Sequence, residues 1–154
     1  MSTIRKRIRD SFLDDAAKVA TFVQLKQGDT VPTAFATMKS VDDMRDLPNQ
    51  IKTDPLPAFY SLIGNEDLQS GVVGYETKLV NCSILVIANN IDLEELLKEI
   101  HYFVVANNNR TENAIRTEYQ GNSLDILSYS ADKQFQSLEI GYGVLYRNLV
   151  GNLS

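Results

Sequence analysis

The chain has 154 residues, of which 44% are hydrophobic and 23% charged, and its formal net charge is −5. These values are typical of a soluble globular protein, and the negative charge argues against a general nucleic-acid binder held by a basic surface. The length predicts a single domain over residues 1–154. No apolar run approaches the ~18 residues of a membrane span, and the single cysteine, Cys82, excludes an internal disulfide framework. We therefore expect a protein without a membrane segment that works in a reducing cytoplasm.

The first predicted element is a helix over residues 3–23. Ser2 or Thr3 is placed to cap its start. Five apolar side chains fall within about 80° of one another at helical spacing and predict one buried stripe. These are Ile4, Ile8, Phe12, Val19 and Phe22.

The same helix concentrates positive charge at its start, in Arg5, Lys6, Arg7 and Arg9. No apolar stretch follows this run, so it is not a secretory signal. Two interpretations remain open: a solvated helix face, or a docking patch for an acidic partner surface. In the second interpretation Arg5, Lys6 and Arg9 are subunit or partner contacts.

The pattern weakens between residues 24 and 74. "VPTAFATMKS" has room for a short strand, and "VDDMRDLPNQIKTDP" indicates an acidic loop or one helical turn. "PLPAFYSLI" is a candidate strand. Either its prolines, Pro55 and Pro57, place the strand at a sheet edge, or they occupy its first residues. "GNEDLQSG" has the composition of a turn. The carboxylates Asp42, Asp43 and Asp46 lack the alternating ligands and central glycine of a calcium loop, which favours a solvated acidic turn.

A long strand, "YETKLVNCSILVIANN", and a helix, "DLEELLKEIHYFVVANN", come next. The strand is apolar on both faces toward its end, so we expect it to be covered on both sides there. Asp92 and Glu95 form a capping box for the helix. One narrow helix face carries the apolar residues Leu93, Leu96, Leu97, Ile100, Phe103 and Val104.

The chain ends in "AIRTEY", "SLDILSYS" and "FQSLEIGYGVLYR", separated by "QGN" and "ADKQ". The last two segments predict an antiparallel hairpin joined near residues 131–134. Together with the preceding elements they indicate an α+β fold: a mainly antiparallel β-sheet with two amphipathic helices packed on one face.

The final strand alternates, and its two faces differ in kind. One face is an ordinary core face of large apolar residues from Leu138 to Tyr146, whereas the other carries Gly141, Gly143, Leu145 and Arg147. Glycines in a strand allow another backbone to approach closely. Either a helix packs over them within the chain, or a second copy of the chain makes contact there, with Leu145 and Arg147 beside the glycines.

Residues that would carry catalysis or bind a metal are few. His101 lies beside the apolar stripe of its helix without a second ligand at metal-binding spacing, so a boundary histidine is favoured over a metal or catalytic role. Cys82 has apolar neighbours in its strand and is expected to be a small core residue. The sequence therefore predicts no enzyme, no cofactor and no metal site.

The order of elements resembles that of the tail terminator proteins of long-tailed bacteriophages. The likeness rests on the amphipathic first helix, the proline-flanked "PLPAFYSLI" running into "GNED", "TKLVNCSILVIA" leading into "DLEELLKEIHYFV", and the closing "SLEIGYGVLY". The resemblance implies a structural virion protein, assembled in the host cytoplasm, that forms a hexameric ring. Such a ring caps the tail tube, ends its polymerisation and meets the head-side connector or stopper protein. Residues 31–54 depart from the family in length.

The resemblance also implies a channel through which DNA passes without specific binding, and negative charge suits such a channel. Asp42, Asp43 and Asp46 are the candidates for lining it. Two alternatives stay open: another head–tail connector or neck component, and a small-molecule-binding α+β domain in which His101 is the obvious site residue.

Overall fold

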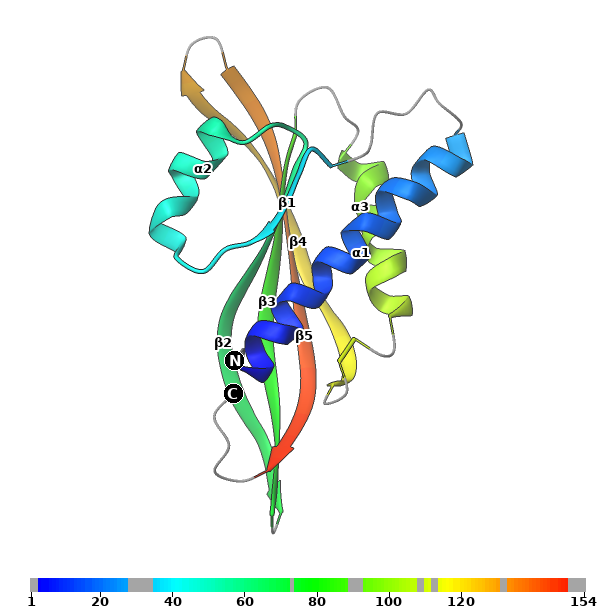
Figure 1. Cartoon of the computed structure of the whole chain (residues 1–154), viewed down its shortest axis with the longest axis vertical. Helices are drawn as coiled ribbons and strands as arrows, with labels where there is room; N and C mark the ends of the chain where they lie inside the picture. Colours follow the sequence, from blue (N-terminus) through cyan, green and yellow to red (C-terminus); the bar gives the residue numbers. More distant parts are fainter. Residues whose placement is uncertain are drawn as a thin grey trace.

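A computed structural model of the chain describes residues 3–27, 35–72, 74–88, 93–107, 110–111, 114–130 and 133–149. Within these ranges lie three α-helices, a short 3-10 helix and five strands (Figure 1). The helices are α1 (Ile4–Gln27), η2 (Met44–Asp46), α2 (Leu47–Thr53) and α3 (Leu93–Ala106). The strands are β1 (Thr37–Ser40), β2 (Ala58–Val72), β3 (Tyr75–Ala88), β4 (Ala114–Ser130) and β5 (Lys133–Leu149).

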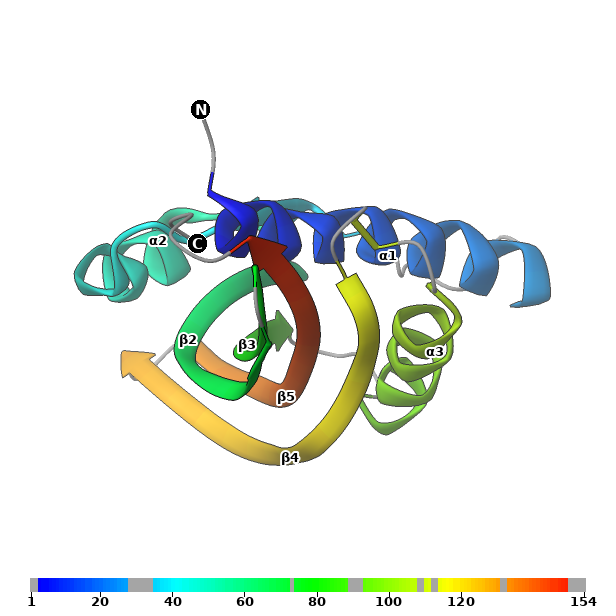
Figure 2. The same cartoon turned by 90° about the horizontal axis from the view of Figure 1, so that it is seen from below.

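The five strands form one sheet in the order β1-β2-β3-β5-β4. Only the β1–β2 pair is parallel, and the other three pairs are antiparallel. The mainly antiparallel α+β fold predicted from the sequence is confirmed. Figure 2, which looks along the strands, shows that the sheet is strongly twisted and that β4 curves around the outside of β5.

Helices α1 and α3 pack on the same face of the sheet, which we call the helix face. On it lie the large residues of β5 together with Val80, Cys82, Ile84 and Val86 of β3, all buried against the apolar stripes of the two helices. Thr3 caps α1, because its Oγ1 accepts a hydrogen bond from the Lys6 N–H at 3.2 Å. Phe22, Leu93 and the proposed Asp92–Glu95 capping box lie outside the side chains that the structure describes.

Helix α2 covers one end of the opposite face of the sheet, which we call the outer face. Its Leu47 and Ile51 pack with Tyr60 and Leu62 of β2 and with Ile87 of β3 in a second buried cluster. This cluster explains why β3 is apolar on both faces toward its end, as the sequence indicated.

One predicted turn and one predicted break between segments are wrong. "GNEDLQSG" continues β2, and "QGN" lies inside β4. Both segments contain irregular pairing, between Ile63 and Glu66 on β2 and between Tyr119 and Gly121 on β4. Residues that suit turns also suit bulges, because both need unusual backbone angles; Gly121 has φ +123°.

The first four residues of β2 are not at the sheet edge, because β1 pairs with them, and the strand begins directly after Pro57, at Ala58. β1 pairs with the first four residues of β2, with Thr37 opposite Ala58 and Ser40 opposite Ser61. The sequence interpretation that confined the prolines to the start of the strand is therefore the one that holds. The predicted closing hairpin is confirmed, since Ser130 of β4 pairs with Lys133 of β5.

Candidate assembly surfaces

The basic start of α1 is engaged mainly within the chain. Arg9 is buried, and its Nη1 donates to the Val41 carbonyl at 3.2 Å and to Asp42 Oδ1 at 2.8 Å. Its Nε donates to Asp10 Oδ1 at 3.1 Å. Arg5 Nη2 donates to the Gly64 carbonyl at 2.8 Å, whereas the Lys6 side chain is exposed. Of the three predicted contact residues, Lys6 is the one that presents its whole side chain to solvent.

The acidic loop has its charge partly compensated. Asp42, 75% exposed at its side chain, pairs with Arg9, so one residue from each predicted cluster meets the other. Asp43 accepts hydrogen bonds from the side chain and the backbone N–H of Arg45, and both hold the pKa of that carboxyl below its usual value. Asp46 precedes α2 and is exposed. The loop thus keeps one carboxylate, Asp46, for which no ion pair is seen among the described side chains.

The glycines of β5 lie on the outer face and make room for a side chain of the next strand. Gln120 of β4 crosses over β5, and its Nε2 donates to Oδ1 of Asn81 on β3 at 2.9 Å. A Cβ on Gly143 would stand 2.5 Å from that nitrogen and 3.0 Å from Cδ1 of Leu79. Gln120, rather than a helix, therefore covers Gly143.

Leu145 and Arg147 follow the glycines on the same face of β5. Leu145 is half-buried beside Leu79, its cross-strand partner on β3, and Arg147 is exposed opposite Thr77. The sequence does not single out Gln120, because "QGN" separates two predicted segments there. The alternation of β4 through "RTEYQ" was the signal that could have placed it beside the glycines.

His101 packs at the boundary of the core, as predicted. Its Nδ1 is 3.2 Å from the hydroxyl oxygen of Tyr142, and its ring contacts those of Tyr142 and Tyr119. Burial raises the pKa of Tyr142, the largest effect on that group, so its hydroxyl stays protonated at neutral pH. The arrangement is a packed aromatic cluster in which the histidine satisfies a buried hydroxyl.

Cys82 lies in the core of the sheet, as expected. Burial raises the pKa of its thiol to about 12, which leaves almost no thiolate at neutral pH. Among the described residues no group of three or more histidine, cysteine, aspartate and glutamate side chains is arranged to hold a metal ion. No helix in the described ranges is both long and apolar enough to pass through a bilayer.

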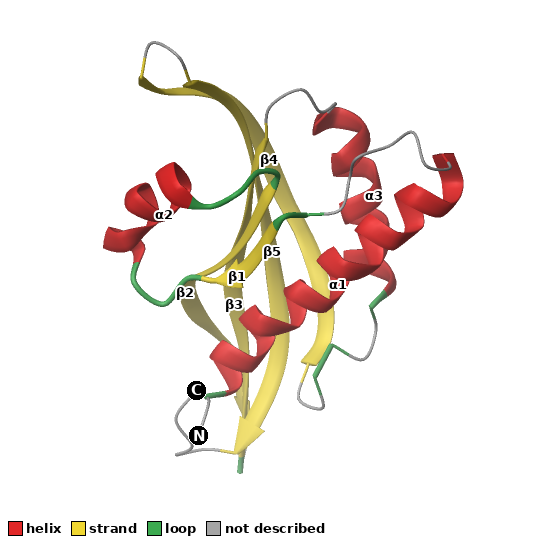
Figure 3. Cartoon of the chain, turned by 45° about the horizontal axis from the view of Figure 1, so that its top comes forward, coloured by secondary structure: helices red, strands yellow, loops and turns green. Residues whose placement is uncertain are grey.

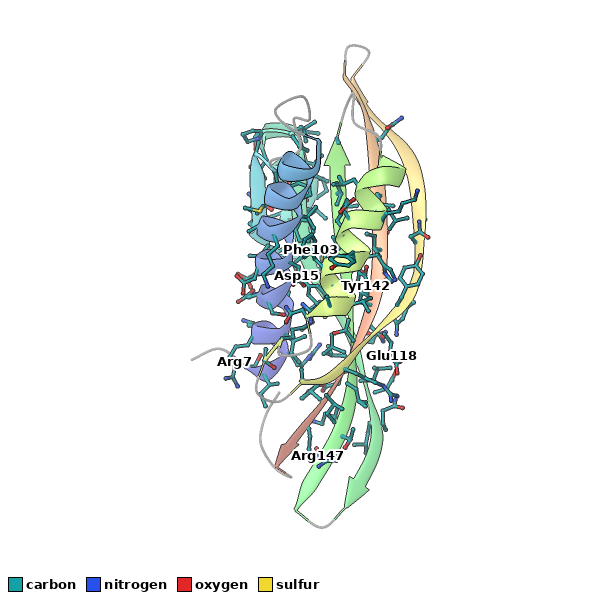
Figure 4. All side chains as sticks on the ribbon, turned by 90° about the vertical axis from the view of Figure 1, so that its right-hand side faces the viewer. Arg7, Asp15, Phe103, Glu118, Tyr142 and Arg147 are labelled. Atoms are coloured by element: carbon teal, nitrogen blue, oxygen red, sulfur yellow. The ribbon has the colours of Figure 1, made fainter. Side chains whose placement is uncertain are left out.

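A buried ion pair that the sequence did not reveal joins the chain just after α3 to α1. Arg110 Nη1 lies 2.7 Å from Asp15 Oδ2, and both side chains are about 1% exposed. Arg110 also donates to the Val104 carbonyl and to Thr117 Oγ1, and its guanidinium stacks over the Phe12 ring at 4.1 Å. Burial raises the pKa of Asp15, while Arg110 opposes that shift. Figure 4 shows Asp15, Phe103 and Tyr142 between the helices and the sheet.

Both hairpins of the sheet reach beyond the helices. Figures 1 and 3 show the β4–β5 hairpin extending past one end of the helix-covered region and the β2–β3 hairpin past the other. Leu68, on the β2–β3 hairpin, is 62% exposed. On β4, Ile115 is 47% and Tyr119 45% exposed. These two hairpins and the apolar side chains on the outermost strands are the most prominent candidate contact surfaces.

Comparisons with known proteins add little to this description of the surfaces. No model of a known protein family matches the sequence, and no curated protein matches it. One similar solved structure is a chain of the virion of a native gene transfer agent particle, 14% identical, covering 88% of this chain and 98% of that chain, with a TM-score of 0.46. Another is a crystal structure from Akkermansia muciniphila, 9% identical, covering 96% of this chain and 77% of that chain, with a TM-score of 0.37. Because both TM-scores lie below 0.5, neither likeness carries an argument about what this chain does.

Proposed function

We propose that this chain is a structural virion protein that forms a hexameric ring at the end of a phage tail tube. In this function the ring ends tube polymerisation and joins the tail to the head-side connector or stopper protein. The proposal rests on the resemblance of the sequence to tail terminators and on the shape of the subunit. No bond is made or broken in this role; the chain acts by fitting against its own copies and its neighbours.

The observation that carries the proposal is the pair of hairpins at opposite ends of the sheet. Each extends past the region that α1 and α3 cover (Figure 3). Leu68 is apolar and largely exposed on the β2–β3 hairpin. A contact with a neighbour would bury such a side chain at a gain of about 1.5–3 kcal/mol.

The opposite directions of the hairpins suit a ring with two different neighbours. If the strands run along the ring axis, one circle of hairpins points to the tail tube and the other to the connector. The formal net charge of −5 then weakens the attraction of the ring for DNA that passes through it. The acidic loop with Asp42, Asp43 and Asp46 remains a candidate for the channel wall, with Asp46 as its carboxylate without a visible ion pair.

Electron microscopy of negatively stained protein, with light scattering in parallel, tests the ring directly. We expect closed rings, either of the purified protein alone or on the ends of purified tail tubes. A protein that stays monomeric in both conditions would contradict the proposal.

Deleting the gene separates tail termination from a neck role. Loss of a terminator gives over-long or unstable tails, because nothing stops the polymerising tube. Tails of normal length detached from heads would instead identify the chain as another connector or neck component.

A further inference from the structure

The outermost strands of the sheet leave two backbone edges open. β4 is the last strand in the sheet order, and over its described residues it pairs only with β5. At the other side β1 pairs with just four residues of β2, from Ala58 to Ser61, so residues 62–72 extend beyond it; within this stretch Arg5 Nη2 binds the Gly64 carbonyl. We call β4 and this stretch of β2 the two open edges. An edge strand offers unpaired N–H and C=O groups that another strand can bind.

We propose that neighbouring copies of this chain join by pairing the β4 edge of one copy with the β2 edge of the next. This inference rests on the proposed ring and names the surface that closes it. The two edges lie on opposite sides of the same sheet, so the contact is head-to-tail, as a ring requires. A contact that used one edge twice would give only dimers.

The strand directions fit this pairing. β2 is antiparallel to β3, β3 to β5, and β5 to β4, so β4 runs parallel to β3 and opposite to β2. Copies that share one orientation around a ring therefore bring β4 against β2 in antiparallel fashion. Antiparallel pairing is the more stable arrangement per residue.

The exposed apolar side chains of the two edges also lie at nearly the same level. The cross-strand register places Leu68 in one row with Lys78, Tyr146 and Ala114. Ile115, the extra residue at the register shift between Ala114 and Arg116, lies within one residue of this row on the other side of the sheet. Ile115 and Leu68 are both large, apolar and exposed, at 47% and 62% respectively. When the sheet continues sideways into a second copy, these two side chains meet and leave water together.

The level of Tyr119 supports the same alignment. Tyr119 of β4 lies in one row with Tyr142, Cys82 and Ile63. Tyr119 is 45% exposed and Ile63 is partly buried at the edge of the core. A neighbour's Tyr119 beside Ile63 would add a second apolar row, four residues along β3 from the first.

A pair of engineered cysteines tests the contact by its geometry. We expect the variant Leu68→Cys/Ile115→Cys to form, under mild oxidation, a ladder of disulfide-linked species that continues past the dimer. Leu68→Cys alone and Ile115→Cys alone should each give no such ladder, because position 68 on the β2 edge of one copy meets position 115 on the β4 edge of the next. Native Cys82 does not interfere, since it is buried with a thiol pKa of about 12. Val105→Cys/Ile115→Cys is the matched control, because Val105 is similarly exposed but lies on α3.

Charge substitutions test whether the contact holds the assembly together. Leu68→Lys alone and Ile115→Glu alone should each reduce the assembled fraction by about tenfold or more, because each places an unpaired charge in an apolar contact. The double variant should regain assembly, since every contact then holds one charge of each sign. Val105→Lys should assemble normally. Thermal unfolding of each variant shows whether the subunit itself has folded.

The outcomes separate this inference from the proposed function. Rings of unmodified protein whose Leu68→Cys/Ile115→Cys variant also forms rings but no ladder would overturn the edge pairing and leave the ring function standing. A ladder from open filaments, with no closed ring alone or on tail tubes, would support the pairing and overturn the tail-end function. Assembly by Leu68→Lys as strong as by Val105→Lys would also overturn the pairing.

Discussion

The two faces of β5 show how one strand serves two purposes. On the helix face Ile140 and Tyr142 are fully buried beneath α1 and α3. On the outer face Gly141 and Gly143 carry no side chain, and Gln120 crosses them to reach Asn81. The helix face of β5 therefore contributes large buried side chains to the core, whereas its outer face is thin at the two glycines and covered there by a polar side chain. Substitutions on the two faces should differ in cost accordingly.

The largest expected effect lies on the helix face, at the buried ion pair. Arg110→Ala should lower the free energy of unfolding by about 3–5 kcal/mol, because Asp15 is then left buried without its cationic partner and keeps the hydrogen bond from Asn107 Nδ2. Replacing both members, as Asp15→Leu/Arg110→Met, should cost much less, since no charge remains to be buried. Urea unfolding measures both variants. Equal losses in the single and double variants would show that the pair is not the source of the effect.

A pair of apolar substitutions compares the faces directly. Ile140→Ala should cost about 2–5 kcal/mol, because it opens a cavity in a fully buried site. Leu145→Ala, on the outer face of the same strand, should cost less than about 1.5 kcal/mol, because Leu145 is only half-buried. The comparison is made by urea unfolding of the unassembled subunit, since contacts between copies would add to the second value. A larger loss for Leu145→Ala would reverse the assignment of the core.

The glycines of the outer face provide a smaller and more local test. Gly143→Ala should cost about 1 kcal/mol, because the new Cβ displaces the Gln120 amide from Asn81 and removes a hydrogen bond. Gly141→Ala is the control: its Cβ would meet the nearest atom, Gln120 Cβ, at 3.6 Å, an ordinary contact, so its stability should be nearly unchanged. In a Gln120→Ala background the cost of Gly143→Ala should shrink. Equal effects of the two glycine substitutions in the native background would argue against this explanation.

The smallest expected effect is at the surface. Asp42→Asn should change the free energy of unfolding by less than about 1 kcal/mol, because the Asp42 side chain is 75% exposed and solvent screens its pairing with Arg9. Thermal unfolding at low and high salt measures the contribution. A loss that is large and insensitive to salt would show that the Arg9–Asp42 pair is shielded from water.

The helices and strands with a clear hydrophobic periodicity are predictable from the sequence, and those without such a periodicity are not. The stripe of Ile8 and Phe12 and the alternation from Leu138 to Tyr146 each follow from one side of an element being buried. The course of β2 was misjudged, because Gly64 and Asn65 satisfy a bulge as well as a turn. The parallel place of β1 beside β2 depends on contacts between distant parts of the chain, which no local pattern encodes.

The candidate surfaces were predictable only in part, for the same reason. The unusual outer face of β5 was visible in the alternation of Gly141 and Gly143, but its cover, Gln120, lies on another strand. The Arg110–Asp15 pair joins residues 95 positions apart, and neither residue differs in the sequence from a surface charge. Arg9 is among the predicted docking residues because its place in the first turns of a helix does not reveal that its side chain points into the protein.

β5 is the last of the described strands in chain order, yet it lies inside the sheet, between β3 and β4. Without it, Val80, Cys82 and Ile84 of β3 have no partner strand on that side. A chain cut short before residue 133 therefore cannot complete the sheet, because β3 and β4 are joined only through β5 in the sheet order.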